Sequence, residues 1–307
     1  MDYNKLDIHI NNYRTDNIIA LKELSLTILF NYIIVYIRHD INIILWTFLN
    51  TLILVKWFII FHDTGHNSFF SNKKINKYIQ KIVSYLIFTP SKWKITHIYH
   101  HNNNGKHIEY NETIFMTKNQ YAESSKIKKI TYNILRHPII FFIFIPFIMW
   151  FIIYRTPIES NKWIDIYNKI ENTIFNIILV YIIYSDYFIY YYISVYCSAF
   201  IGLVLFHLQH TYEDSYICVN DKEWNKYETA LKGCSHLKIP YIFKWFTMGI
   251  EYHHIHHLNS KVPGYLLKKC HDEAPKHFWQ DVTYLNYKDI FKSLKLMLYD
   301  EDNGIFI

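Results

Sequence analysis

The chain has 307 residues, of which 51% are hydrophobic and 19% aromatic, a more apolar balance than most soluble proteins have. It carries 32 Lys and Arg against 26 Asp and Glu, a formal net charge of +6. The positive residues fall between apolar blocks and form no basic stripe interleaved with aromatic residues, so the composition favours a membrane protein and argues against nucleic-acid binding.

The first apolar region follows a polar N-terminal segment, residues 1–23, and consists of two blocks, Leu24 to Ile37 and Ile41 to Phe61. A spanning helix needs about 20 apolar residues. The second block is long enough alone, whereas the first is short and needs tilt or local thinning of the bilayer. We therefore expect residues 24–61 to form a membrane hairpin, in preference to two buried helices of a soluble protein.

The next region, residues 62–172, is polar and rich in lysine except for two segments. Ile75 to Phe88 is amphipathic and suited to lie along a membrane surface. Pro138 to Tyr154 is apolar, and we expect Pro146 to break it in the middle because proline lacks the backbone donor that a helix needs. A second hairpin is expected at residues 173–206, where Ser185 and Asp186 separate two apolar blocks.

Eight histidines stand in three short clusters beside apolar, aromatic-rich sequence. Residues three and four apart share one face of a helix, so each cluster can direct its imidazoles to one point. Such a concentration of neutral nitrogen donors indicates a transition-metal site. The clusters are HDTGH (His62, His66), HIYHH (His97, His100, His101) and HHIHH (His253, His256, His257).

The position of the clusters constrains the membrane topology. Ligands of one metal site must lie on one side of the membrane, so an even number of crossings must separate the second cluster from the third. We expect the segment 138–154 to be re-entrant or in-plane, which also keeps the following basic residues on the side of the lysine-rich loop. The predicted fold is an all-α integral membrane protein of about four spanning helices in two hairpins, with a cytosolic helical cap built from residues 62–172 and 207–307.

The ligand type limits the choice of metal. Eight imidazoles exceed the coordination of one ion, so two ions are implied, and imidazole suits iron, copper or zinc. Structural zinc commonly takes cysteine ligands, but no cysteine neighbours a histidine cluster, and the four cysteines form no CxxC pair. Two irons fit best for oxygen chemistry beside lipid. The Glu-x-x-His ligands of soluble di-iron bundles are missing.

The clusters resemble the three histidine boxes of the membrane fatty acid desaturase family. The resemblance extends from about Phe61 to Asp272 and is closest to acyl-lipid desaturases of the bacterial and plant Δ12 type. The matching segments are HDTGHNSFF (62–70), WKITHIYHH (93–101), LQHTYED (208–214) and WFTMGIEYHHIHHLNSKVPGYLL (245–267).

The resemblance implies that all eight box histidines ligate a pair of iron ions and that one further histidine completes the site. That residue would be His210, because the family keeps the Gln-His pair, and His207 is the alternative. His207 and His254 are then expected to lie outside the set of metal ligands, either as partners of ligating residues or with no role in the site. One departure is Phe206, since the acyl-CoA branch has an asparagine near this helix end. The implied catalytic and metal residues are His62, His66, His97, His100, His101, His210, His253, His256 and His257.

Several neighbours of the boxes have expected supporting roles. Asp63, Glu213 and Asp214 are candidate acceptors for the outer ring N–H of ligating histidines, with ordinary solvated acids as the alternative. Three aromatic residues are candidates to line an acyl tunnel or to act as interfacial anchors, namely Trp93, Trp245 and Phe246.

The resemblance implies oxygen-dependent desaturation of a fatty acyl chain, with a cis double bond introduced at a Δ12 or omega-6-like position and dioxygen reduced to two waters. The alternatives are a related lipid hydroxylase, or an enzyme that modifies sphingolipids or carotenoids. A metal-binding or transport protein is less favoured, because transport would place ionisable residues inside spanning segments and only Lys56 and Asp186 approach that.

The expected partners follow from the reaction. The substrate is a fatty acyl lipid or an acyl-CoA, and two electrons per cycle must come from a separate donor of the cytochrome b5 or ferredoxin type, since no fused donor module is apparent. The expected location is an endoplasmic-reticulum-like or bacterial inner membrane with a cytosolic active site.

Overall fold

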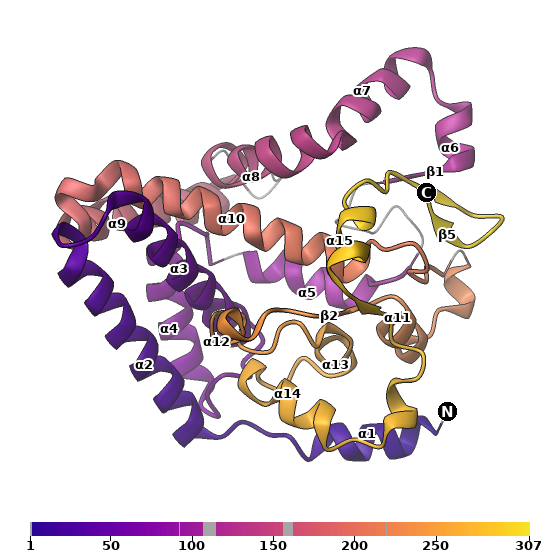
Figure 1. Ribbon diagram of the computed structural model, residues 1–307, viewed down its shortest axis with the longest axis horizontal. Coiled ribbons are helices and arrows are strands. Elements are labelled where there is room, and N and C mark those ends of the chain that lie inside the picture. The colour runs from indigo at the N-terminus through magenta and orange to yellow at the C-terminus, as the bar shows by residue number, and fades with distance from the viewer. Residues whose placement is uncertain (1, 92, 107–114, 156–161, 219) are drawn as a thin grey trace.

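The structure is a computed structural model that describes residues 2–91, 93–106, 115–155, 162–218 and 220–307. It is mostly helical, as the composition predicts. Figure 1 shows long helices gathered on one side and a cap of short helices and strands on the other. The long helices are α2 (Asn17–Tyr36), α3 (Ile43–Gly65), α4 (Lys73–Leu86), α9 (Lys162–Tyr184) and α10 (Phe188–His210).

The remaining elements are short. The helices are α1 (Tyr3–Asn11), η1 (Ile37–His39), α5 (Trp93–Asn103), α6 (Lys118–Glu123), α7 (Lys126–Arg136), η3 (Ile140–Phe144), α8 (Ile145–Phe147), η4 (Ile148–Ile153), η5 (Ser185–Tyr187), η6 (Asp221–Glu223), α11 (Lys226–Lys232), η7 (Tyr241–Phe243), α12 (Lys244–Thr247), α13 (His253–Leu258), α14 (Gly264–Asp272), η8 (Lys276–Trp279) and α15 (Tyr287–Ser293). Strand β4 (Leu298–Asp300) pairs with β1 (Met116–Thr117) and β5 (Ile305–Phe306), and β2 (His236–Leu237) pairs with β3 (Tyr284–Leu285).

Three helical stretches of the described chain are long and apolar enough to cross a membrane, Asn17–His39, Ile43–Gly65 and Ile166–His210. The first is longer than its apolar block because α2 begins at Asn17, where the Asp16 carboxylate accepts hydrogen bonds from the first turn. Its 20 residues correct the expectation that this span is short. A fourth candidate is the bent pair Lys126–Arg136 and Ile140–Ile153.

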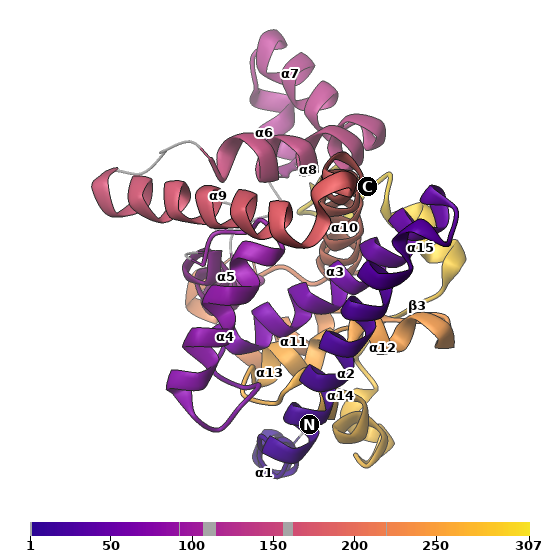
Figure 2. The same ribbon diagram turned by 90° about the vertical axis from the view of Figure 1, so that its left-hand side faces the viewer.

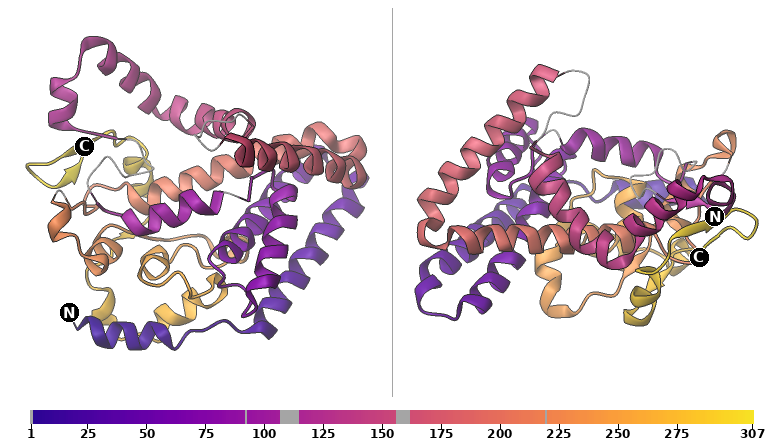
Figure 3. Two further views of the ribbon diagram at one scale, coloured as in Figure 1. Left: turned by 180° about the vertical axis from the view of Figure 1, so that it is seen from behind. Right: turned by 90° about the horizontal axis from the view of Figure 1, so that it is seen from above.

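The stretch Ile166–His210 has 45 residues and contains most of α9 and all of α10. Figure 3 shows the chain changing direction at η5, where Ser185 and Asp186 lie between the two apolar blocks. Helix α10 then packs along α3, whereas α9 packs against α4 (Figure 2).

Segment 138–154 is helical throughout, which contradicts the expectation that Pro146 breaks it. Proline removes one backbone donor and its ring crowds the preceding turn. The wider π-helical turns η3 and η4, on either side of α8, absorb this change without ending the helix. The sharp bend lies earlier, where the helix forms an angle of 67° with α7.

Helices α4 and α7 turn apolar faces outward. In α4 the exposed fractions of Ile75, Tyr78 and Ile82 are 43%, 69% and 62%, whereas the polar Asn76 and Gln80 are buried. In α7 the exposed residues include Ile127, Ile130 and Ile134, spaced three and four apart. This arrangement is the reverse of that in a soluble protein and suits helices that contact lipid.

The cap holds the N-terminal helix against the C-terminal part of the chain. Leu6 and Ile10 of α1 are buried in one cluster with Leu267 and Cys270 of α14. Figure 1 shows α5 between α10 and α13, so segments far apart in the sequence meet where the long helices join the cap.

Candidate metal centre

The nine histidines predicted as ligands come from four separate segments and meet in one place. His62 lies in the last turn of α3 and His66 caps that helix. Helices α5 and α13 each contribute one box, and His210 is the last residue of α10. The imidazole nitrogens form two groups, His62, His66, His97, His101 and His256 in the first, and His100, His210, His253 and His257 in the second.

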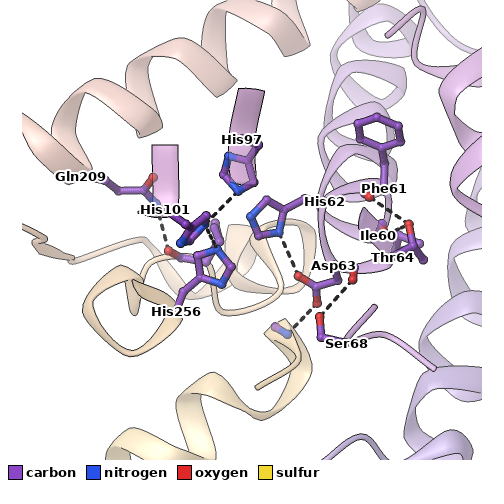
Figure 4. Close-up of polar contacts among 12 residues, drawn as sticks. Ile60, Phe61, His62, Asp63, Thr64, Ser68, His97, His101, Gln209 and His256 are labelled. Atoms are coloured by element: carbon purple, nitrogen blue, oxygen red, sulfur yellow. Dashed lines mark hydrogen bonds and ion pairs between the residues drawn. The ribbon is translucent and has the colours of Figure 1, made fainter. Parts of the chain in front are cut away.

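In the first group the ring nitrogens converge, as Figure 4 shows for four of its members. The Nε2 atom of His101 lies 3.1 Å from Nε2 of His97 and 2.9 Å from Nε2 of His256. The Nε2 atoms of His62 and His66 are buried and have no hydrogen-bond partner among the described residues. Buried polar atoms without a partner are rare in folded proteins, so these two nitrogens indicate a ligand.

The second group repeats this geometry. The Nε2 atom of His210 lies 3.1 Å from that of His100 and 2.9 Å from that of His253. The Nε2 atoms of His253 and His257 are 3.1 Å apart. Two nitrogens that bind one ion at about 2.1 Å each, at right angles, lie about 3.0 Å apart. The spacing in both groups therefore fits nitrogens that share a metal ion.

The electrostatics keep these rings in the form that binds metal. Burial lowers the pKa of His97 and of His256 well below the ordinary value. Burial lowers the pKa of His100 to about 3, with a smaller effect from His62. These three rings are therefore neutral at physiological pH, and a neutral imidazole offers the lone pair that ligation requires.

Asp63 orients the first box. Its carboxylate is buried, and one oxygen lies 2.9 Å from Nδ1 of His62 (Figure 4). The other oxygen accepts a hydrogen bond of 2.7 Å from the backbone N–H of Gly264. An acceptor on Nδ1 holds the ring proton there and leaves Nε2 free to face the site. The expected contact between Asp63 and the outer nitrogen of His62 is thus confirmed.

Glu213 and Asp214, the other two acids expected beside histidines, lie elsewhere. The carboxylate of Glu213 pairs with Lys292 at the surface, and Asp214 is exposed. Both follow the end of α10, where the chain turns away from the rings. The prediction for these two residues is wrong.

Two histidines that the sequence left open lie outside both groups. The ring of His207 packs against Phe141 and Phe142, and its Nε2 lies 3.0 Å from the backbone oxygen of Ser293. The Nε2 of His254 lies 3.3 Å from Nδ1 of His271. Both rings are therefore outer residues, as expected.

One cysteine does lie beside the centre, contrary to expectation. The Sγ of Cys234 is 3.8 Å from Nδ1 of His210 and accepts a hydrogen bond from the Asn104 amide. It faces the outer nitrogen of the ring and so supports His210. No local pattern signals this contact, because 24 residues separate the two side chains.

The turn before α13 depends on Gly249. Its φ is +84°, a conformation that side-chain-bearing residues rarely adopt. A Cβ there would also lie 2.4 Å from the backbone oxygen of Gly264. This close approach brings the third box beside the loop that Asp63 binds.

A cavity of about 680 Å³ reaches the histidines from the side of the long helices. Its wall includes His62, His97 and His253, so residues of both groups border it. The rest of the wall is mainly apolar and comes from α3, α10 and the segment 140–153. It is a suitable shape for a long apolar chain.

Of the three aromatic residues predicted to line such a tunnel, Trp93 does so. The rings of Trp245 and Phe246 pack instead against Phe30 of α2. Phe206 also lines the cavity, with its ring centroid 5.1 Å from that of His100. Phe206 is therefore a hydrophobic residue of the cavity wall beside the second histidine group.

The comparisons with known proteins agree with this centre. The family described as "Fatty acid desaturase" matches residues 41–287. A "Fatty acid desaturase" of Bacillus subtilis is 30% identical over 290 residues, which cover 90% of this chain and 81% of the relative.

Two further relatives have more specific names. An "Omega-3 fatty acid desaturase, endoplasmic reticulum" of Vigna radiata is 31% identical over 116 residues, or 37% of this chain and 28% of the relative. An "sn-1 oleoyl-lipid 12-desaturase" of Picosynechococcus is 24% identical over 261 residues, or 77% of this chain and 70% of the relative. The match to the family over most of the chain, together with the converging histidine boxes, shows that this protein belongs to the fatty acid desaturase family.

Proposed function

We propose that this desaturase introduces a cis double bond at a Δ12 or omega-6-like position of a fatty acyl chain, and that its nine clustered histidines hold two iron ions. One observation carries the proposal. Nine imidazoles lie in two groups of five and four, and three of them border an apolar cavity. The Δ12 position has the weaker support, which is the name of a relative 24% identical to this chain.

The donor set is compatible with iron, and the reaction favours iron over the other metals. All nine side chains are imidazoles, and imidazole suits iron, copper and zinc. A methylene group has no acidic proton, so no side-chain base can remove its hydrogen. A bound iron pair supplies the oxidising power from dioxygen that this reaction requires.

The chain itself contributes position and shielding. The apolar cavity wall excludes water and holds the acyl chain beside His62, His97 and His253. Closely held geometry accounts for a large part of many enzymatic rates. Asp63 holds the proton on Nδ1 of His62, so that Nε2 keeps its direction toward the centre.

We further propose four membrane crossings in two hairpins, by α2 with α3 and by α9 with α10. The histidine cap would then lie on the cytosolic side, with a separate cytochrome b5 or ferredoxin donor docking there. The outward isoleucines of α7 support a position on the membrane surface for the segment between the hairpins.

Expression in yeast, followed by analysis of fatty acid methyl esters, tests the proposal. The intact chain should yield a new unsaturated product, and His256→Ala should abolish it with loss of iron. His277→Ala is the matched control, because His277 is exposed. A hydroxylated product would overturn desaturation, and a product in a protein that contains no iron would overturn the di-iron centre.

A further inference from the structure

Arg136, the last residue of α7, is a buried cation in the cavity wall. Its exposed fraction is 5%. Nη2 donates a hydrogen bond of 3.0 Å to the backbone oxygen of Leu296, and the guanidinium lies 4.5 Å from the ring centroid of Phe141. Nε and Nη1 are buried and have no hydrogen-bond partner among the described residues.

The second largely buried arginine of the cavity region behaves differently. Both terminal nitrogens of Arg155 are engaged, Nη1 with Asn172 at 2.7 Å and Nη2 with the backbone oxygen of Phe88 at 2.8 Å. Arg155 therefore has the contacts of a structural residue. Nε has no hydrogen-bond partner in either arginine, but Arg136 also lacks one at the terminal Nη1, with the Tyr132 hydroxyl as a polar neighbour. A buried charge that is so incompletely paired is unfavourable.

Arg136 lines the same cavity as the candidate metal centre. The same wall contains His62, His97 and His253, so a ligand long enough to extend along the cavity would reach from Arg136 to the histidines. The remaining wall is mostly apolar. An apolar cavity with a cation at one place in its wall fits an acyl chain whose polar end carries an oxyanion.

We propose that Arg136 binds the oxyanion at the polar end of the acyl substrate, a carboxylate or a phosphate. This inference rests on the proposed function and defines its substrate as an anionic acyl compound. Anchoring that end determines how far along the chain the methylene beside His97 lies, so Arg136 positions the substrate for the reaction.

Binding to the purified full-length protein tests this assignment without catalysis. Oleate, 1-oleoyl-lysophosphatidate and 1-oleoylglycerol differ in their polar ends, and tryptophan fluorescence reports their binding because Trp93 and Trp150 line the cavity. At least one anionic ligand should bind about tenfold more tightly than oleoylglycerol. A preference for oleate indicates a carboxylate, and a preference for the lysophosphatidate indicates a phosphate.

Two variants and one control complete the design. Arg136→Gln should abolish the preference, and Arg136→Lys should retain most of it. Arg38→Gln is the control, because Arg38 lies at the far turn beside Asp186. Equal binding of all three ligands by the wild type, or a preference that survives in Arg136→Gln, would overturn the assignment. Neither result bears on the yeast test of desaturation, so the role of Arg136 and the proposed function can be rejected independently.

A second observation concerns Gly202 in α10, which also lines the cavity. A Cβ built on Gly202 would meet no atom within 4 Å. Glycine destabilises the middle of a helix relative to alanine. Since no neighbour requires a glycine here, packing does not account for it.

We infer that Gly202 leaves room for the acyl chain and so helps to determine which chain lengths the enzyme accepts. It lies eight residues before His210, about 12 Å along the helix. A side chain added at this position would project into the space that the substrate occupies.

Gly202→Ala and Gly202→Leu in the yeast assay test this inference. Gly202→Ala should leave the thermal midpoint of unfolding unchanged. Gly202→Leu should retain its iron, but the amount of product should fall by about tenfold and the product should shift toward shorter acyl chains. Ile193→Phe, on an exposed part of α10, should change neither property. An unchanged product profile in Gly202→Leu would overturn the inference. Failure of this variant to fold would overturn it too, because a side chain that projects into open space should not disturb folding.

Discussion

The carboxylate of Asp63 joins two segments that are 201 residues apart. One oxygen faces His62 of the first box and the other accepts from Gly264, which follows the third box. Outer partners of metal-binding histidines fix the ring and raise its basicity. Asp63 therefore couples the direction of one imidazole to the closure of the cap.

Asp63→Asn should weaken metal binding. The amide can accept from Gly264 or from His62, but it lacks the charge that holds the ring proton. Loss of such a partner typically lowers metal affinity by about 10- to 100-fold. Iron content after dialysis against a graded chelator measures the change.

Asp214→Asn is the control, because Asp214 is exposed and should leave the iron content unchanged. Equal iron retention by Asp63→Asn and the wild type would contradict the role given to Asp63.

Acidification should destabilise the metal-free protein. Burial lowers the pKa of His100 and of His236 from 6.5 to about 3. Both rings are neutral in the folded state, whereas the unfolded state binds a proton at each below pH 6.5. Their contribution is therefore complete above that pH and is lost as the pH falls toward 3, at about 1.4 kcal/mol per pH unit for each ring.

The thermal midpoint of the metal-free protein measures this effect between pH 8 and pH 5. It should stay level above pH 7 and fall below pH 6.5. A midpoint that rises on acidification would show that these rings are protonated in the folded state.

The grouping of the eight box histidines could be predicted because spacings of three and four residues are a local property of a helix, whereas His210 was expected only from the resemblance to the family. Their surroundings could not, since they depend on contacts made only on folding. Cys234 reaches His210, and Arg136 reaches the cavity, through tertiary packing. Glu213 is adjacent in sequence to the turn after α10, yet its carboxylate pairs with Lys292 at the surface.

At the level of helices, an ion pair joins α2 to α3. Lys56 is fully buried, and its Nζ lies 2.7 Å from the Glu23 carboxylate and 2.9 Å from the backbone oxygen of Trp245. The sequence indicated Lys56 as an ionisable residue inside a span, but Glu23 lay just before the expected apolar block. The pair neutralises the charge and fixes the position of α2 beside α3 and α12.

Lys56→Met or Glu23→Gln should each destabilise the protein strongly. Removing one partner leaves the other charge buried alone, at a cost of about 3 to 5 kcal/mol. The double variant Lys56→Met with Glu23→Leu should recover much of this loss. Thermal unfolding in detergent measures all three.

The pair Lys268 and Asp272 offers the matched control, since both side chains are about half exposed. Lys268→Met should have little effect on the midpoint. Single variants of the buried pair that unfold like the wild type would show that the pair is solvated.

Helix identity could be predicted well from apolar blocks, but helix ends could not. Asp16 extends α2 into residues that hydropathy alone assigns to a polar segment. Pro146 lies within a continuous helix because π-helical turns on both sides accommodate it. Both cases depend on particular hydrogen bonds of the backbone, which the average hydropathy of a segment does not reveal.

For the molecule as a whole, the proposed sidedness follows from the position of the histidines. All nine converge where the long helices meet the cap, so the segments that carry them share one side of the membrane. The turns at residues 37–39 and 185–187 then face the opposite side, where Arg38 and Asp186 pair.

Labelling with a membrane-impermeant maleimide tests this topology. Cysteines placed at Lys128 and Lys276 should react only after permeabilisation of intact cells, and a cysteine at Asp40 should react before it. All three positions are exposed. Labelling before permeabilisation at both position 276 and position 128 would show that the orientation is opposite to the one proposed. Labelling before permeabilisation at only one of the two would contradict the two hairpins.

The spread of the histidines along the chain also determines when the centre can form during biosynthesis. The first of the clustered histidines is His62 and the last is His257, and the second proposed hairpin, α9 and α10, lies between them in sequence. A nascent polypeptide still attached to the ribosome before α13 emerges lacks three of the nine donors. Metal loading is consequently a late step of maturation, and a chain truncated ahead of α13 could enter the membrane without ever acquiring a complete centre.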